Sequence, residues 1–148
     1  MYGHVETIEQ RVTHLEHLRN VQDEKGGFTA FIAWNFQPDY TDLGGDTSRW
    51  DGKKATGYDY LRTIAISRLF LDNIPSFQAS WVTQGAKIAQ VSLKYGVNDF
   101  GSTMMEENVV SAAGTSHTDA MTLQTMQRLI EDAGYDAVRR NTQYDLVN

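Results

Sequence analysis

The chain has 148 residues, of which 41% are hydrophobic, and both values are typical of a single globular domain. Its formal net charge is -6 and it contains no basic run, so we expect a small molecule or a protein as partner and no nucleic acid. The absence of cysteine excludes disulfides, a thiolate zinc site and an iron-sulfur cluster held by cysteines of this chain. No apolar run is long enough to span a bilayer and no signal region is evident, which indicates a cytoplasmic protein without a membrane partner.

The first residues predict the end of a strand and then a helix. Residues 1–4, MYGH, are typical of the last turn of a strand, where a complete domain seldom begins. Thr7 stands three residues before Gln10, and this capping box predicts a helix over residues 7–22. The apolar residues of the helix recur at helical spacing and predict one buried face: Ile8, Val12, Leu15 and Leu18.

A strand and a long loop follow. Residues 28–36, FTAFIAWNF, are almost continuously apolar, and a strand that is apolar on both faces indicates a buried parallel sheet. Residues 37–56 are too polar for a core and too long for a simple connector, so we expect a functional loop. Four aspartates in it resemble calcium ligands loosely, but their spacing matches no EF-hand, and we expect a solvated loop without a metal: Asp39, Asp42, Asp46 and Asp51.

The middle of the chain predicts a helix, a strand and another helix. The helix over residues 58–72 has an apolar stripe made of Leu61, Ile64, Ala65 and Leu69. In the strand over residues 77–84, FQASWVTQ, Phe77, Ala79 and Trp81 alternate with Gln78, Ser80 and Val82. The next helix, residues 86–95, ends at Gly96, a residue typical of helix C-termini.

The last third predicts one more strand and two helices. The strand VNDFG, residues 97–101, leads into a helix over residues 103–113, where Thr103 and Glu106 have the spacing of a capping box. A final helix over residues 122–133 stops before Gly134. Residues 135–148 predict a weak strand or an ordered C-terminal extension.

These elements amount to four βα units in one partial domain, residues 1–148. The α/β pattern predicts half of a (βα)8 TIM-type barrel, with parallel strands alternating with helices, and an open flavodoxin-like sheet is the alternative. A half barrel has exposed strand edges, here near Met1 and Val97. Because exposed edges pair with other strands, we expect the chain to self-associate.

Polar and aromatic residues follow the predicted strands, where βα folds bind their ligands. They are rich in amides and hydroxyls and poor in Lys and Arg, and neither a glycine-rich dinucleotide motif nor a P-loop occurs, so the pattern favours sugar hydroxyls and a flat ring over a bare phosphate. Structural roles stay open, because Trp34 and Trp81 also suit barrel packing and a strand-end Asn or Asp often caps a helix. The set comprises Gly3, His4, Glu6, Trp34, Asn35, Gln37, Ser80, Trp81, Thr83, Gln84, Asn98, Asp99, Ser102 and Thr103, and Gln78 is a further candidate within its strand.

Four segments together closely resemble the C-terminal half of the dehypoxanthine futalosine cyclase family: YGHVET, GGFTAFIAWNFQP, YLRTIAISRLFLDNIPSFQASWVTQG and YGVNDFGSTMMEENVVSAAG. Members of this family are radical S-adenosylmethionine enzymes of the futalosine route to menaquinone, and aminofutalosine synthase and the deazaflavin-cofactor synthases share weaker forms of the motifs. The resemblance implies a (βα)8 barrel in which a reduced [4Fe-4S] cluster cleaves S-adenosylmethionine to a deoxyadenosyl radical. That radical would abstract a ribose hydrogen from dehypoxanthine futalosine, and the sugar radical would close onto the aromatic ring.

The resemblance also implies roles for individual residues. Gly3, His4, Glu6 and Asn35 correspond to cofactor-binding positions, and Glu106 is the candidate for removing the ring proton unless the helix cap engages it. The substrate-binding positions implied are Gln78, Ser80, Trp81, Asn98, Asp99 and Thr103.

The chain departs from the family in one large respect. The family's N-terminal half, with its three spaced cluster cysteines, has no counterpart here, and no cysteine replaces them. We therefore expect the chain alone to be inactive, with the missing half barrel as a partner and both S-adenosylmethionine and the cluster bound in the full-length enzyme. A stand-alone α/β module that binds a nucleoside-like ligand, or none, and performs no redox chemistry is the other interpretation.

Overall fold

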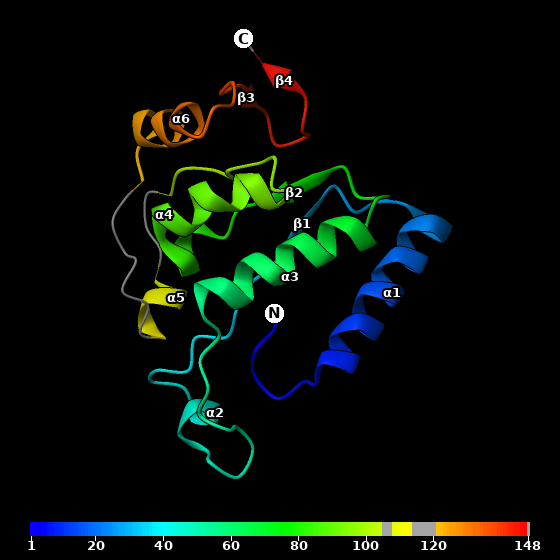
Figure 1. Ribbon diagram of the computed structural model, residues 1–148, viewed down its shortest axis with the longest axis vertical. Helices are drawn as coiled ribbons and strands as arrows, with labels where there is room; N and C mark the ends of the chain where they lie inside the picture. Colours follow the sequence, from blue (N-terminus) through cyan, green and yellow to red (C-terminus); the bar gives the residue numbers. More distant parts are fainter. Residues whose placement is uncertain (105–107, 114–120, 148) are drawn as a thin grey trace.

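The computed structural model describes residues 1–104, 108–113 and 121–147 (Figure 1). The strands are β1 (Ala30–Ile32), β2 (Ser76–Gln78), β3 (Arg139–Arg140) and β4 (Leu146–Val147). The helices are α1 (Ile8–Lys25), α2 (Asp42–Gly45), α3 (Gly57–Phe70), α4 (Trp81–Ser92), the 3-10 turn η1 (Leu93–Tyr95), α5 (Val109–Ala112) and α6 (Leu123–Asp132).

The central strands are parallel. β1 pairs with β2, with Phe31 opposite Phe77. Single parallel bridges extend this order on both sides, from Tyr2 to Asn35 and from Gln78 to Asp99. Strand segments that are consecutive in the chain are therefore neighbours in space, as in consecutive βα units. This confirms the α/β class with parallel pairing, whereas closure into a barrel is not a feature of the described residues.

The core lies between one face of this sheet and the helices. Most of the largest fully buried side chains come from α3, β2 and the segment between them: Tyr60, Ile64, Ser67, Leu71, Ile74 and Phe77. The opposite face of β1 is open, because Ile32 is 36% and Trp34 41% exposed. The expectation that this strand is buried on both faces is therefore wrong for the described structure, in which only the face with Phe31 meets the core.

Two helices have burial patterns that differ from the prediction. On α3, Leu69 is 83% exposed, whereas Thr63 and Ser67 are buried, so the buried face is rotated from the expected stripe. On α1, Leu15 is buried, but Ile8 and Val12 are 57% and 44% exposed. Apolar spacing gives the period of a helix, but the face that turns inward on α3 also includes Thr63, whose hydroxyl accepts a hydrogen bond from Arg11 of α1 at 3.2 Å.

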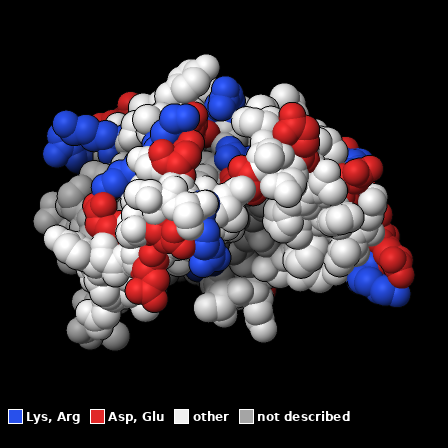
Figure 2. Space-filling model, turned by 90° about the horizontal axis from the view of Figure 1, so that it is seen from below, with Lys and Arg blue, Asp and Glu red and all other residues white. Residues whose placement is uncertain are grey.

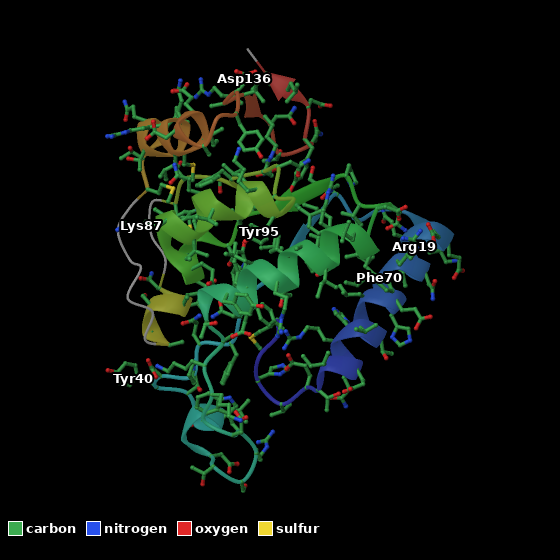
Figure 3. The ribbon with its side chains drawn as sticks, viewed as in Figure 1. Arg19, Tyr40, Phe70, Lys87, Tyr95 and Asp136 are labelled. Carbon is green, nitrogen blue, oxygen red and sulfur yellow. The ribbon has the colours of Figure 1, made fainter. Side chains whose placement is uncertain are left out.

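The helix α1 is fixed at both ends. The predicted capping box is confirmed, since Thr7 and Gln10 exchange side-chain to backbone hydrogen bonds. Near the other end, the Arg19 guanidinium donates to the carbonyl of Phe70 at 2.6 Å and pairs with Asp72, which ties α1 to the end of α3 (Figure 3).

The predicted strand over residues 77–84 is wrong in its second half. β2 ends at Gln78, and Trp81 to Gln84 form a helical turn that Gly85, at φ 78°, separates from the rest of α4. The buried Tyr60 hydroxyl accepts the Ser80 N–H at 3.0 Å, so a residue distant in sequence holds the chain where the strand ends. The helix expected from residue 86 and its stop at the left-handed Gly96 are confirmed.

The C-terminal third is partly as predicted. Residues 103 and 104 are not helical and α5 begins only at Val109, so the expected helix over residues 103–113 is shorter in its described part. Glu106 lies outside the described residues, and so does its capping box with Thr103. The last helix is confirmed as α6, capped by Thr122 and followed by the left-handed Gly134. The C-terminal extension contains the antiparallel hairpin β3–β4.

The loop over residues 37–56 is more ordered than a solvated connector. It contains α2, capped by Thr41, and it buries Trp50 edge-on against Phe36 at a ring distance of 5.7 Å. Tyr40, by contrast, is 89% exposed at the tip (Figure 3). In the part of the chain that the structure describes, no helix is both long and apolar enough to cross a bilayer.

Candidate functional site

The turn after the first strand segment closes around a carboxylate. Glu6 accepts hydrogen bonds from the N–H groups of Gly3 at 2.5 Å and His4 at 3.0 Å, and Arg11 on α1 donates to it at 2.7 Å. His4 Nδ1 lies 2.5 Å from the carboxylate and 2.7 Å from the Val5 nitrogen. The His4 Nδ1 atom donates a hydrogen bond to Glu6 only when it carries a proton, and it accepts the Val5 N–H only when it carries none.

The charge of Glu6 follows from these contacts. Burial raises the pKa of the carboxyl, but the backbone N–H groups of Gly3, His4 and Glu6 and the Arg11 guanidinium outweigh it and lower the pKa to about 2. Glu6 is therefore an anion at neutral pH. The carboxylate orients the turn through its hydrogen bonds, and its low pKa makes it poorly suited to accept a proton.

A cavity of about 300 Å³ opens beside this turn. The turn contributes Gly3, His4, Val5 and Glu6, and the long loop contributes Arg49, Asp51 and Lys53. Gly3 has φ +80°, and a Cβ there would lie 3.1 Å from that of Ala55, so the close approach of the two segments favours glycine. Figure 2 views the molecule from the side of this loop, where acidic and basic side chains are interspersed. Such a cavity suits a ligand that carries both signs of charge.

Asn35 lies at the next strand end in a buried polar network. Its Oδ1 accepts from Gln84 Nε2 at 2.5 Å, and both residues are less than a tenth exposed. Nearby on the chain, Ser80 Oγ and Thr83 Oγ1 are 2.7 Å apart. In the first turn of α4, Gln84 thus hydrogen-bonds the Asn35 side chain, and Thr83 hydrogen-bonds the Ser80 hydroxyl.

A parallel bridge joins Gln78 to Asp99, and the C-terminal hairpin binds Asp99. Arg140 of β3 binds Asp99 through two nitrogens, with Nη2 donating to Oδ1 at 3.1 Å. The Gly101 N–H also donates to Oδ1, at 2.5 Å. A Cβ on Gly101 would lie 2.6 Å from Gln78 Nε2, so the side-chain amide of Gln78 packs directly on this glycine. Arg140 therefore fixes Asp99, and Asp99 fixes the turn against which Gln78 rests.

The remaining predicted site residues lie elsewhere. The Asn98 side chain accepts from the Phe77 N–H and donates to the Pro75 carbonyl, so it bonds to the start of β2 and not to its carboxyl end. Trp81 is buried as the first residue of α4. Thr103 is exposed, and Glu106 is outside the described residues.

Several site residues were absent from the predicted set. Arg11 and Arg140 neutralise Glu6 and Asp99, Tyr60 positions Ser80, and Arg49 and Lys53 line the charged cavity. No local motif marks them, because each partner is brought in from another part of the fold. In the described ranges, no three His, Asp or Glu side chains converge closely enough to hold a metal ion.

The fold and these strand ends define an α/β protein with its polar residues at the ends of parallel strands. Residues 25–148 match the family model described as the CofH/MqnC C-terminal region, and the chain belongs to this family.

The relatives that the chain resembles have several different names. The chain is 50% identical over 145 residues to cyclic dehypoxanthine futalosine synthase of Halalkalibacterium halodurans, covering 98% of this chain and 37% of that protein. It is 43% identical to aminodeoxyfutalosine synthase of Thermus thermophilus, covering 97% and 38%. It is 44% identical to 5-amino-6-(D-ribitylamino)uracil–L-tyrosine 4-hydroxyphenyl transferase of Methanosphaerula palustris, covering 99% and 40%. The chain thus spans about two fifths of the length of these relatives.

Proposed function

We propose that the chain is the C-terminal part of a cyclic dehypoxanthine futalosine synthase, which cyclises dehypoxanthine futalosine with a deoxyadenosyl radical in the futalosine pathway to menaquinone. The identity of 50% over 98% of the chain carries this proposal. The related synthases at 43% and 44% identity are the alternatives within the same family. We also propose that the full-length protein is a soluble enzyme of the cytoplasm.

The cavity beside Gly3 fits S-adenosylmethionine by its chemistry. Arg49 and Lys53 are donors for the carboxylate of its methionine part, and Asp51 is an acceptor for the ammonium group. The left-handed Gly3 lets the turn lie close to Ala55 of the long loop, which brings the two walls of the cavity together. When bound, S-adenosylmethionine supplies the deoxyadenosyl group as radical source. The contribution of this chain is to bind and orient it through a turn that Glu6 and Arg11 hold rigid.

The iron-sulfur cluster does not fit this chain alone. The chain has no cysteine, and thiolates are the ligands that hold such clusters. The part of the longer enzyme outside this chain must supply them, so we propose that the chain by itself is inactive.

The substrate end is proposed at Gln78, Asp99 and the residues near them. The Gln78 amide lies against Gly101 and offers a donor and an acceptor to a sugar hydroxyl. Ser80, Trp81, Asn98 and Thr103 remain candidate substrate contacts, and Glu106 remains the candidate base. Of these, Asn98 has the strongest structural alternative, because both ends of its amide bond to the backbone.

The proposal is tested by reconstituting the whole enzyme from two pieces. This chain is produced together with the region of the H. halodurans synthase that lies outside the match, loaded with iron and sulfide without oxygen, and assayed for the cyclised product. We expect product from the pair, and neither colour nor product from the chain alone. No product from the pair, in an assay where the intact H. halodurans enzyme is active, would contradict the proposed reaction.

A further inference from the structure

The turn between β3 and β4 holds a tyrosine in an unusual backbone conformation. Tyr144 has φ 69°, a left-handed angle that residues other than glycine seldom adopt. The Asn141 side chain organises the turn, because its Oδ1 accepts the N–H groups of Gln143 at 2.8 Å and Asp145 at 3.0 Å. The Asn141 N–H donates to the Asp145 carbonyl at 2.9 Å and closes the turn. Backbone strain of this kind persists only where surrounding contacts fix it, which directs attention to the tyrosine side chain.

The Tyr144 ring packs on Arg140. The guanidinium carbon of Arg140 lies 4.0 Å from the centre of this ring. Each guanidinium nitrogen also donates a hydrogen bond: Nε and Nη2 to Asp99, and Nη1 to the Asn141 carbonyl at 3.0 Å. The guanidinium is therefore engaged with the strand end and with its own turn. Its orientation toward Asp99 depends on the ring against which it stacks.

Asp99 passes this geometry on to the end of β2. Its backbone pairs on both sides of Gln78, since the Asp99 N–H donates to the Phe77 carbonyl at 3.1 Å and the Ala79 N–H donates to the Asp99 carbonyl at 2.8 Å. Its side chain, 7% exposed, accepts the Gly101 N–H at 2.5 Å. The Gln78 amide packs on that glycine, because a Cβ there would lie 2.6 Å from Gln78 Nε2. A shift of the carboxylate would therefore move the surface on which the amide rests.

We propose that Tyr144 and Arg140 are positioning residues for the substrate end of the enzyme. Through Asp99 and Gly101 they hold the Gln78 amide in place to hydrogen-bond a sugar hydroxyl of the nucleoside substrate. This inference rests on the proposed function, and it gives the C-terminal hairpin a part in substrate affinity. Neither residue touches the reacting atoms, so both act on substrate binding and not on the formation of the deoxyadenosyl radical.

A merely structural role of the hairpin predicts a different kinetic result. If Tyr144 only stabilised the fold, its loss would reduce the fraction of active enzyme, which lowers the apparent kcat and leaves KM unchanged. If Tyr144 positions a group that binds the substrate equally before and during the reaction, its loss raises KM and leaves kcat unchanged. The separate effects on KM and kcat therefore distinguish the two roles.

The test uses two variants of Tyr144 in the two-piece enzyme described above. Tyr144→Phe keeps the ring on Arg140, whereas Tyr144→Gly removes the ring and suits the left-handed backbone, so that its effect does not come from strain. We expect Tyr144→Gly to raise the KM for dehypoxanthine futalosine about two- to fivefold, the range of one cation–π contact, at unchanged kcat. Tyr144→Phe should match the unmodified enzyme. Thr142→Ala, exposed in the same turn, is the control and should also match it.

Two further measurements link the effect to Arg140 and to the substrate. In an Arg140→Met enzyme, Tyr144→Gly should raise KM no further, because the ring then has no guanidinium to orient. Cleavage of S-adenosylmethionine to deoxyadenosine without the nucleoside, with dithionite as reductant, should proceed at the same rate in Tyr144→Gly as in the unmodified enzyme. Additive effects of the two substitutions, or a fall in kcat at unchanged KM, would overturn the proposal.

Hydrogen exchange tests the inference apart from the reaction. The Gly101 N–H donates to Asp99, so its exchange rate reports how firmly the carboxylate is held. We expect about two- to fivefold faster exchange in Tyr144→Gly than in Tyr144→Phe, measured by NMR on this chain labelled within the pair. Equal exchange rates would overturn the inference, whether or not the pair forms product. Faster exchange in a pair that forms no product would contradict the proposed function and support the link from Tyr144 to Gly101.

Discussion

Two carboxylates at strand ends, Glu6 and Asp99, are held in the same way. Glu6 accepts from two backbone N–H groups of its own turn and Asp99 from one, and each also pairs with one arginine that another element provides, Arg11 for Glu6 and Arg140 for Asp99. An anion held by fixed donors stabilises the turn around it and keeps nearby backbone in position for a ligand. The hydrogen bonds of these two carboxylates therefore set how rigid the two ends of the candidate site are.

Glu6→Gln should weaken the fold at neutral pH and flatten its response to acid. The pKa of Glu6 is lowered from 4.5 to about 2, so its contribution is complete above pH 4.5 and disappears as the pH falls through about 2. Replacing the charged acceptor should cost about 1.5 to 3 kcal/mol of unfolding free energy at pH 7. Denaturant unfolding between pH 7 and pH 2 measures both effects. Glu16→Gln, an exposed position of α1, is the control and should change little.

Gly101→Ala and Gly52→Ala separate backbone strain from crowding. Both glycines have φ near +80°, but a Cβ meets Gln78 only at Gly101, at 2.6 Å, and finds open space at Gly52. We expect a loss of about 1 to 2 kcal/mol at Gly52 from the left-handed backbone and a larger loss at Gly101. Thermal unfolding compares the two. Adding Gln78→Ala should recover the difference at Gly101, and failure to recover it would show that the amide does not rest on this glycine.

At the scale of elements, helix starts and the C-terminal hairpin depend on different kinds of contact. The starts of α1 and α3 are local, since Thr7 and Thr56 each form a capping box three residues long. The hairpin β3–β4 is joined to the sheet by a contact between residues that are 41 positions apart, Asp99 and Arg140. A local cap is therefore visible in a sequence, whereas the docking of the hairpin is not.

Thr7→Ala should cost about 1 kcal/mol, within a range of about 0.5 to 2, because the Gln10 N–H loses its side-chain acceptor. Thr13→Ala, at an exposed position inside the same helix, is the matched control and should be neutral or slightly stabilising. Urea unfolding of the two variants measures the difference. Equal effects would mean that the capping box contributes nothing beyond helix propensity.

Arg140→Met should release the hairpin, whereas Arg139→Met, at the exposed neighbour, should not. Asp99 has a side chain only 7% exposed, so removing its arginine leaves a poorly solvated charge, with a cost between the roughly 1 kcal/mol of a surface pair and the 3 to 5 of a buried one. Hydrogen exchange of residues 139–147 is the measurement. Asp99→Asn added to Arg140→Met should lower the cost, because no unpaired charge then remains.

For the whole molecule, the open face of β1 is the main feature. Ile32 and Trp34 are exposed there, whereas Val97, at one of the two predicted edges, is only 4% exposed and belongs to the core. A charge at Val97 would therefore disturb packing and would not report on an edge. The self-association expected from exposed strand edges stays a prediction, and Ile32 is the better position at which to test it.

We expect the chain alone to form dimers or larger species at micromolar concentration, which sedimentation velocity measures. Ile32→Lys should weaken the association by adding a charge to the open face, and Leu69→Lys, exposed on α3, should not. A compact monomer in the unmodified chain would contradict the prediction.

The sequence by itself determined the features that depend on neighbours along the chain. The capping box at Thr7, the stop at Gly96 and the last helix with Gly134 all follow from hydrogen bonds or backbone angles within a few residues. Its motifs also identified the family. Only the tertiary structure decided where β2 ends and which polar groups meet. The contacts that decide this join residues far apart in the chain: Tyr60 and Ser80 by 20 positions, Asn35 and Gln84 by 49, and Asp99 and Arg140 by 41. Such pairs are selected by packing of the whole fold, so no local pattern contains them.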